Sequence, residues 1–212
     1  MAALTPWRDM PAVVKWLLGA FALTSLPLFF ASPETQSWIL TNFSVFPARV
    51  AHEGYTLGVL ATLVTHAFLH ANWLHLGMNA LIYLQAAPTV AQRLGGARFL
   101  LLFFISAIGG ALTYLWINPE SRIPAVGASG AICGLFAAFF LAWAPNPREA
   151  LRNPQVRYGV LMFLGINVGL AALARISGTL PIAWEAHLGG FVAGGIAYFL
   201  LAPKHRAVGP WG

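Results

Sequence analysis

Apolar runs and short polar breaks alternate along the whole chain. Each apolar run contains roughly 16–20 residues, close to the length that one helix needs to cross a bilayer. The breaks are rich in proline, glycine and charged residues, which end helices. The pattern predicts an all-α, polytopic membrane protein in which residues 1–212 form a single domain of six membrane-spanning helices, at residues 13–30, 73–90, 98–117, 129–144, 157–174 and 184–201.

The composition supports a membrane protein. Of 212 residues, 58% are hydrophobic and 8% are charged, whereas soluble domains contain about 25% charged residues. The net charge of +6 could indicate a nucleic-acid partner, but the basic residues form no cluster with interleaved aromatic residues. We therefore expect the lipid bilayer as the surroundings and no nucleic acid.

A cleaved signal peptide is the alternative interpretation of residues 13–30, because Ala31 follows an apolar run that basic residues precede. The run is longer than a usual signal core, and the residues around Ala31 match the cleavage consensus poorly. We therefore expect the first span to be retained.

The region between the first two spans is harder to assign. Residues 32–54 mix aromatic and charged side chains, and they are expected to form a long loop in the membrane interface. Asn72 is a suitable N-cap, so the second span is expected to begin near Trp73. Residues 56–71 are then expected to be backbone covered by protein at the outer face, not a helix that faces lipid.

The basic residues predict the orientation, because cytoplasmic loops carry more Lys and Arg. The breaks on one side contain only Arg49, Arg122 and Arg175. We expect both termini in the cytoplasm and the starts of the second, fourth and sixth spans at the outer face. The basic residues of the other side are Arg8, Lys15, Arg93, Arg98, Arg148, Arg152, Arg157, Lys204 and Arg206.

Polar side chains inside a span are energetically costly, so each indicates a function. Ser129 is flanked by small residues, a pattern that on its own is more typical of close helix packing. His75 and Asn79 share one helix face, and on their own they fit an interhelical hydrogen-bond pair equally well. The candidates in the outer halves of the spans are His75, Asn79, Ser129 and His187.

Two GxxxG pairs suggest how a serine and a histidine could meet. Gly130 and Gly134 lie on the helix of Ser129, and Gly190 and Gly194 lie on the helix of His187; such pairs let helix backbones approach closely. A serine hydroxyl needs a base within reach to become nucleophilic. Among the spans, Asp and Glu are nearly absent, with only Glu185 at an edge. No carboxylate is then available to orient the histidine, so we expect a two-residue dyad.

Two other uses of the histidines are possible. His66 and His70 are four residues apart and could bind a metal ion with His75 and His187, but the chain has no HExxH motif, cysteine ligand or buried carboxylate to support zinc. A proton or ion pathway would be expected to use intramembrane carboxylates and internal repeats, and neither is found. We expect no metal or other cofactor, and expect His66 and His70 to anchor the outer loop.

Taken together, the motifs resemble those of the rhomboid intramembrane serine proteases, in the same order from about Thr65 to Gly194. They are His66-Ala67-Phe68-Leu69-His70, His75, Asn79, Gly127-Ala128-Ser129-Gly130 and Ala186-His187-x-x-Gly190-x-x-x-Gly194. The resemblance implies that Ser129 is the nucleophile, that His187 is the general base, and that the His75 and Asn79 side chains form the oxyanion hole with the Ser129 backbone N–H.

The resemblance also implies helix packing at Gly127, Gly130, Gly134, Gly190 and Gly194. It implies a serine endopeptidase that cleaves transmembrane helices of single-span proteins near the outer face, in the bacterial inner membrane, with no indication of the oligomeric state. The alternative is an inactive relative that binds membrane helices as a chaperone or retention factor. Such relatives typically lack the serine or the histidine, and both are present here.

The chain departs from the family pattern at two places. Many bacterial members have a Trp-Arg pair where Ala61-Thr62 stands, so the docking of the outer loop is expected to differ. The position four after the serine is usually an aromatic residue that stacks on the histidine, and here it is Cys133. We therefore expect His187 to be held less rigidly. We do not expect a thiol nucleophile, because Cys133 lies one turn deeper in apolar surroundings.

Overall fold

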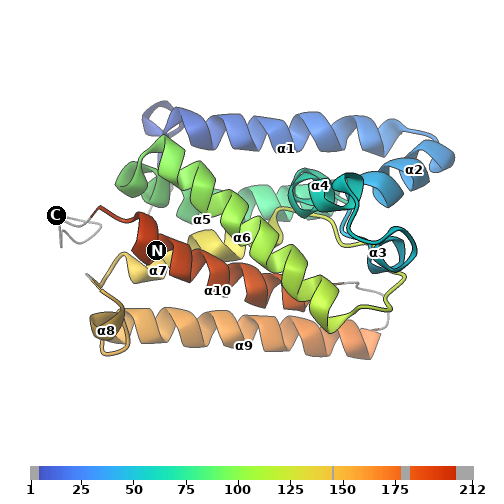
Figure 1. Cartoon of the computed structure of the whole chain (residues 1–212). Coiled ribbons are helices and arrows are strands. Elements are labelled where there is room, and N and C mark those ends of the chain that lie inside the picture. The colour runs from blue at the N-terminus through green and yellow to red at the C-terminus, as the bar shows by residue number, and fades with distance from the viewer. Residues whose placement is uncertain (1–4, 145, 178–181, 204–212) are drawn as a thin grey trace.

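The computed structural model describes residues 5–144, 146–177 and 182–203. Helices make up almost all of this part of the chain, and its only β-type pairing is an isolated bridge between Val45 and Ala125. Figure 1 shows the long helices side by side, with α1 (Ala12–Phe30) and α9 (Pro154–Ser177) at opposite edges of the bundle. The protein is all-α, as predicted.

Six helices correspond to the predicted spans. By length and composition, three can cross a membrane, namely α1, α6 and residues Pro154–Leu173 of α9. The bent pair of Leu57–Phe68 and Trp73–Leu94 would make a fourth. The apolar helix α7 is shorter, so the count of six spans stays a prediction. Apart from the helices between α1 and α5, which are described below, the remaining helices are η1 (Trp7–Asp9), α5 (Trp73–Leu94), α6 (Gly96–Ile117), α7 (Ser129–Leu141), α8 (Pro147–Ala150) and α10 (Trp184–Leu201).

The helix α9 begins before the predicted start at Arg157. The Asn153 side-chain oxygen accepts a hydrogen bond from the backbone N–H of Gln155 at 2.9 Å, which satisfies one of the donors left open at a helix start. Pro154 occupies the first helical position, where no backbone N–H is needed. The Asn-Pro pair therefore sets the start of α9.

The prediction of a loop over residues 32–54 is wrong, because two short helices lie there. They are α2 (Pro33–Phe43) and α3 (Pro47–Glu53), each with proline in its first turn. The Ser32 hydroxyl accepts a hydrogen bond from the Thr35 N–H at 3.3 Å and caps α2.

Residues 56–71 were expected to be backbone covered by protein and not a helix that faces lipid, but most of that range is helical and part of it is exposed. Helix α4 (Leu57–Thr65) is followed by the 3-10 turn η2 (His66–Phe68), and the pair is bent by 78° from α5. Leu57 is 86% exposed, so α4 presents one face outward. The start of α5 at Trp73 is as predicted, with the Asn72 side chain accepting the N–H of His75 at 2.9 Å.

Helices α7 and α10 contact each other through their glycines. A Cβ atom added at Gly190 would lie 2.6 Å from the carbonyl carbon of Gly130, and one added at Gly194 would lie 2.7 Å from that of Gly134. Real Cβ atoms do not approach other atoms so closely, so only glycine fits at these positions. The backbones of α7 and α10 are therefore in direct contact.

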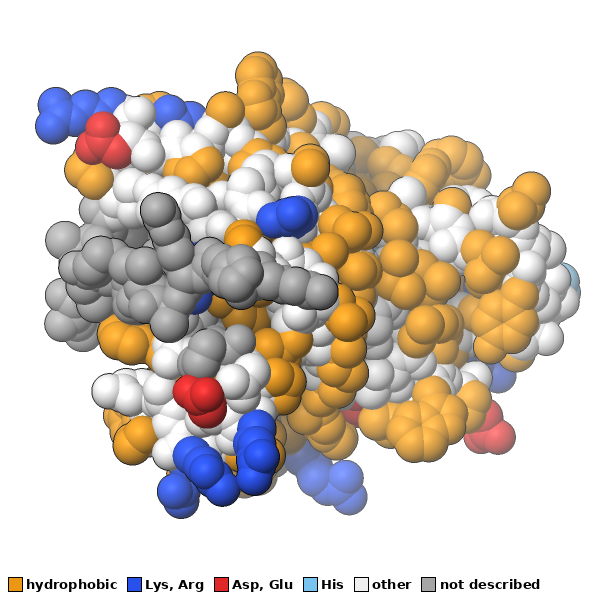
Figure 2. All heavy atoms as spheres, turned by 60° about the vertical axis from the view of Figure 1, so that its left-hand side comes forward, with side chains coloured by type: hydrophobic (Ala, Val, Ile, Leu, Met, Phe, Trp, Pro, Cys, Tyr) orange, Lys and Arg blue, Asp and Glu red, His pale blue; other side chains and the backbone are white. Residues whose placement is uncertain are grey.

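The described basic residues of the larger group belong to one end of the bundle, at the left of Figure 1, where α1, α6 and α9 begin and α5 and α10 end. Figure 2 shows this end, with Lys and Arg side chains at its upper edge, near its centre and gathered at its lower edge. Arg49, Arg122 and Arg175 belong to the opposite end. Lys204 and Arg206 lie outside the described residues. The charge asymmetry along the sequence thus becomes an asymmetry between two ends of the bundle.

Candidate active site

Ser129 and His187 meet where α7 and α10 begin. Ser129 is the first residue of α7, and His187 lies in the first turn of α10. The distance between Ser129 Oγ and His187 Nε2 is 2.9 Å, within the range for a nucleophile hydrogen-bonded to its base. Both side chains are partly exposed.

The loop before Ser129 is held by the backbone. The Gly127 N–H donates to the His66 carbonyl at 2.9 Å, and Gly127 has φ +117°, a conformation that other residues rarely adopt. A Cβ atom at Gly127 would lie 2.7 Å from His75 Nε2. Gly127 therefore makes room for the His75 ring, and the expectation that it takes part in helix packing is wrong.

His75 and Asn79 lie on the first turns of α5. The Ala71 N–H donates to His75 Nδ1 at 3.4 Å, which leaves the ring proton on Nε2, the atom near Gly127. Asn79 Nδ2 donates one hydrogen to the His75 carbonyl at 2.9 Å, and an amide nitrogen has a second hydrogen to offer. Each of these two residues therefore has a side-chain donor available for a ligand.

Asn167 is a site residue that the sequence reasoning missed. Its side-chain oxygen lies 2.9 Å from His187 Nδ1, and the residue is only 8% exposed. An amide oxygen can accept from the base as a carboxylate can, but it is not marked by charge in the sequence. A single asparagine inside the apolar run of residues 157–174 is itself a costly polar group in a membrane, and that signal could have identified it.

The environment of His187 differs from the family pattern in the way Cys133 suggests. Cys133 is a free thiol on α7, four residues after Ser129. No aromatic ring stacks on His187 within the described part of the chain. The amide of Asn167 is in contact with the imidazole instead.

The rings of His66 and His70 make contacts of different range. His66 Nδ1 lies 2.9 Å from the Thr62 carbonyl, and His70 Nδ1 lies 2.9 Å from the Ser25 hydroxyl on α1. Over residues 5–144, 146–177 and 182–203, no group of three or more His, Cys, Asp or Glu side chains is arranged to hold a metal ion. The contact with α1 favours the anchoring role for His70, whereas the ring of His66 bonds within its own segment.

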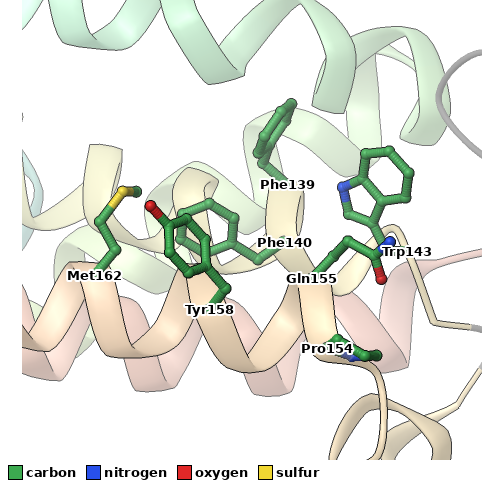
Figure 3. A pocket seen from close by; sticks show the side chains of 8 residues that line it. Phe139, Phe140, Trp143, Pro154, Gln155, Tyr158 and Met162 are labelled. Carbon is green, nitrogen blue, oxygen red and sulfur yellow. The ribbon is translucent and has the colours of Figure 1, made fainter. Parts of the chain in front are cut away.

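An apolar pocket of about 390 Å³ lies between α7 and α9, well away from Ser129. Figure 3 shows Phe139, Phe140 and Trp143 on one side of it, and Tyr158 and Met162 of α9 on the other. Phe139 is ten residues after Ser129, which is about 15 Å along a helix. The pocket is therefore not part of the Ser129–His187 site.

Comparison with known proteins identifies the family. Residues 57–204 match the Rhomboid domain. The chain is 31% identical over 203 residues to the rhomboid protein YdcA of Bacillus subtilis, covering 91% of this chain and 89% of that one. It is 32% identical over 192 residues to Rhomboid-like protease 3 of Toxoplasma gondii, covering 89% of this chain and 65% of that one.

Other relatives are longer. RHOMBOID-like protein 5 of Arabidopsis thaliana is 28% identical over 150 residues, covering 70% of this chain and 47% of the relative. The chain thus spans between about half and nine-tenths of the length of these three relatives. With its apolar helices, the chain is an integral membrane protein, and it belongs to the rhomboid family, whose members are typically intramembrane serine proteases.

Proposed function

We propose that this protein is an intramembrane serine endopeptidase in which Ser129 is the nucleophile and His187 is the general base. The observation that supports this most strongly is the 2.9 Å contact between Ser129 Oγ and His187 Nε2. The contact joins two helices whose backbones touch through Gly130 and Gly190, so the geometry depends on backbone packing and not on long, flexible side chains.

In the first half of the reaction, Ser129 Oγ attacks a peptide carbonyl while His187 Nε2 takes the hydroxyl proton. The negative charge on the carbonyl oxygen is stabilised by the Ser129 backbone N–H, His75 Nε2–H and Asn79 Nδ2–H. Each such donor contributes roughly 3 kcal/mol in the transition state. His187 then gives its proton to the leaving amine, the C–N bond breaks, and Ser129 carries the acyl group.

In the second half, a water molecule attacks the acyl carbon while His187 takes one of its protons. The ester bond to Ser129 breaks, and His187 returns the proton to Oγ. The position of Ser129 and His187 at the first turns of their helices, with both side chains partly exposed, gives water a route from the end of the bundle.

The substrates would be transmembrane helices of single-span proteins, cut near the outer membrane face. A helical peptide group hides its carbonyl in a hydrogen bond, so the substrate must unwind locally. Small or helix-breaking residues make unwinding easier. The basic end of the bundle would face the cytoplasm, with both termini there and the protein in a bacterial inner membrane.

The test is cleavage of a purified single-span test substrate in detergent and in liposomes. The parent is expected to cleave it, and Ser129→Ala and His187→Ala are each expected to lose activity by roughly 1000-fold or more. Ser106→Ala is a matched control, because Ser106 is a buried serine that donates to the Leu102 carbonyl at 2.7 Å and lies on α6. An inert parent, or cleavage by Ser129→Ala, would exclude this function.

A further inference from the structure

Both ring nitrogens of His187 have a hydrogen-bond partner. Nε2 lies 2.9 Å from Ser129 Oγ, and Nδ1 lies 2.9 Å from Asn167 Oδ1. A neutral imidazole carries its proton on one nitrogen and accepts at the other. His187 can take a proton from Ser129 only if Nε2 is the accepting nitrogen, so the group at Nδ1 determines whether the base is ready.

The orientation of the Asn167 amide follows from its second contact. Asn167 Nδ2 donates to the Phe163 carbonyl at 2.9 Å, and a carbonyl oxygen can only accept. Turning the amide over would place two acceptors against each other at Phe163. Oδ1 must therefore face His187, and it requires a proton on Nδ1. Nε2 is left with its lone pair directed at the Ser129 hydroxyl.

We propose that Asn167 is a positioning residue that fixes the tautomer and ring orientation of His187. The proposal rests on the proposed protease function, and it adds a third member to the Ser129–His187 pair. An amide can do this without placing a second charge inside the membrane, where an isolated carboxylate would be costly. It also supplies the restraint that an aromatic residue at the position of Cys133 would otherwise give.

The neighbourhood of Asn167 is built to hold it. Phe163, one turn before it on α9, stacks on Phe191 of α10 with ring centroids 3.9 Å apart and an interplanar angle of 14°. Phe163 and Asn167 are both 8% exposed. The stack fixes α9 against α10 one turn away from the amide, so Asn167 reaches His187 from a supported position.

The tautomer of His187 would then depend on the position of α9, which carries Asn167. In the apolar stretch of α9 that could cross the membrane, 17% of the residues are buried inside the protein, against 39% in that of α6. A displacement of α9 would break the contact between Asn167 and His187, while Ser129 and His187 would stay together on α7 and α10. A helix that is less buried than α6 thus controls the protonation pattern of the site.

The first test compares Asn167→Leu, which keeps the approximate size but removes the acceptor, with Asn167→Asp, which keeps an acceptor oxygen. With the full chain and the test substrate, Asn167→Leu is expected to lower kcat roughly 10- to 100-fold, a part of what a well-placed base contributes, with KM changed less than about twofold. Asn167→Asp keeps the acceptor at His187 Nδ1 but sets a second oxygen against the Phe163 carbonyl, so it is expected to recover only part of the kcat that Asn167→Leu loses. Val168→Leu, at an exposed neighbour on α9, is the matched control.

The second test reads the tautomer directly by ¹⁵N NMR of protein labelled at histidine. The His187 signal, identified by its loss in His187→Gln, is expected to show protonated Nδ1 and unprotonated Nε2, and Asn167→Leu is expected to lose this pattern. Protonated Nε2 in the parent, or unchanged tautomer and kcat in Asn167→Leu, would overturn the proposal. The spectrum needs no turnover, so it gives an answer even if the protein proves inert or Asn167→Leu fails to fold.

Discussion

Helices α10 and α9 both reach the site, but they are held in different ways. On α10, Gly190 and Gly194 bring the backbone against α7, with no space for a side chain between them. On α9, nothing lies within 4 Å of a Cβ atom added at Gly165 or Gly169. Helix α9 instead contacts α10 through side chains, the stacked ring of Phe163 and the amide of Asn167.

This difference separates two requirements of a serine hydrolase. The nucleophile and the base must be close, and backbone contact between α7 and α10 gives them a position that can hardly vary. The base must also have the correct tautomer, and a side-chain contact from α9 can supply or withdraw that. If the proposed function holds, the contact between α7 and α10 would bring Ser129 and His187 together, and the contact from α9 would set the tautomer of His187.

The largest effect is expected from a change that breaks the packed region. Gly190→Val would drive a branched side chain into the carbonyl of Gly130, and overpacking of this kind costs about 3 kcal/mol. We expect cleavage to be lost and unfolding in a denaturing detergent to begin at a much lower concentration. Gly169→Ala on α9 is the control, and its stability should stay within about 1 kcal/mol of the parent. Equal effects at both glycines would remove the distinction between the two helices.

A smaller loss of activity is expected from a substitution on α5, which is neither of the two helices compared above. Asn79→Ala removes a proposed oxyanion donor and should lower kcat about 100-fold, with stability changed little. Single-turnover cleavage measured beside an unfolding curve would show this. If kcat and stability fell together, Asn79 would be a packing residue and not a donor for the transition state.

A still smaller loss of kcat is expected when the contact between α9 and α10 is weakened. Phe163→Leu removes the ring stacked on Phe191, which is worth about 1 kcal/mol beyond its buried area. We expect kcat to fall several-fold, because Asn167 loses its nearby support, while labelling of Ser129 by a fluorophosphonate continues at a reduced rate. Complete loss of labelling would mean that α9 also holds the Ser129–His187 pair together.

The smallest effect is expected at the free thiol. Cys133→Ala should leave kcat within about twofold of the parent, because Ser129 and not the thiol contacts His187. Cleavage should also resist thiol-blocking reagents. Loss of activity in either experiment would assign Cys133 a part in the chemistry.

Much of the fold could be predicted from hydropathy alone. A long apolar run has few alternatives in a membrane, which is why α1, α5, α6 and α10 lie where the sequence suggested. The segment before α5 was harder, because α2, α3 and α4 are short and their proline and hydroxyl caps are local signals within a mixed composition. Hydropathy averaged over a span could not resolve them.

The site was predictable only in part. Ser129 and His187 each stand in a recognisable sequence motif. Asn167 is a single polar residue in an apolar helix, 20 positions from its partner His187. The role of Gly127 was also missed, because its positive φ and its contact with His75 depend on how a loop folds over α5. Contacts between distant segments have no local pattern from which to infer them.

The length of α7 has a consequence for where a substrate would be cut. Its 13 residues rise about 20 Å, whereas the hydrocarbon core of a bilayer is about 30 Å thick. With the far end of α7 at the basic surface, Ser129 would sit about 10 Å below the opposite one. The length of α7 would then set the depth of Ser129 in the membrane, and the scissile bond would lie roughly seven helical residues inside the substrate's span.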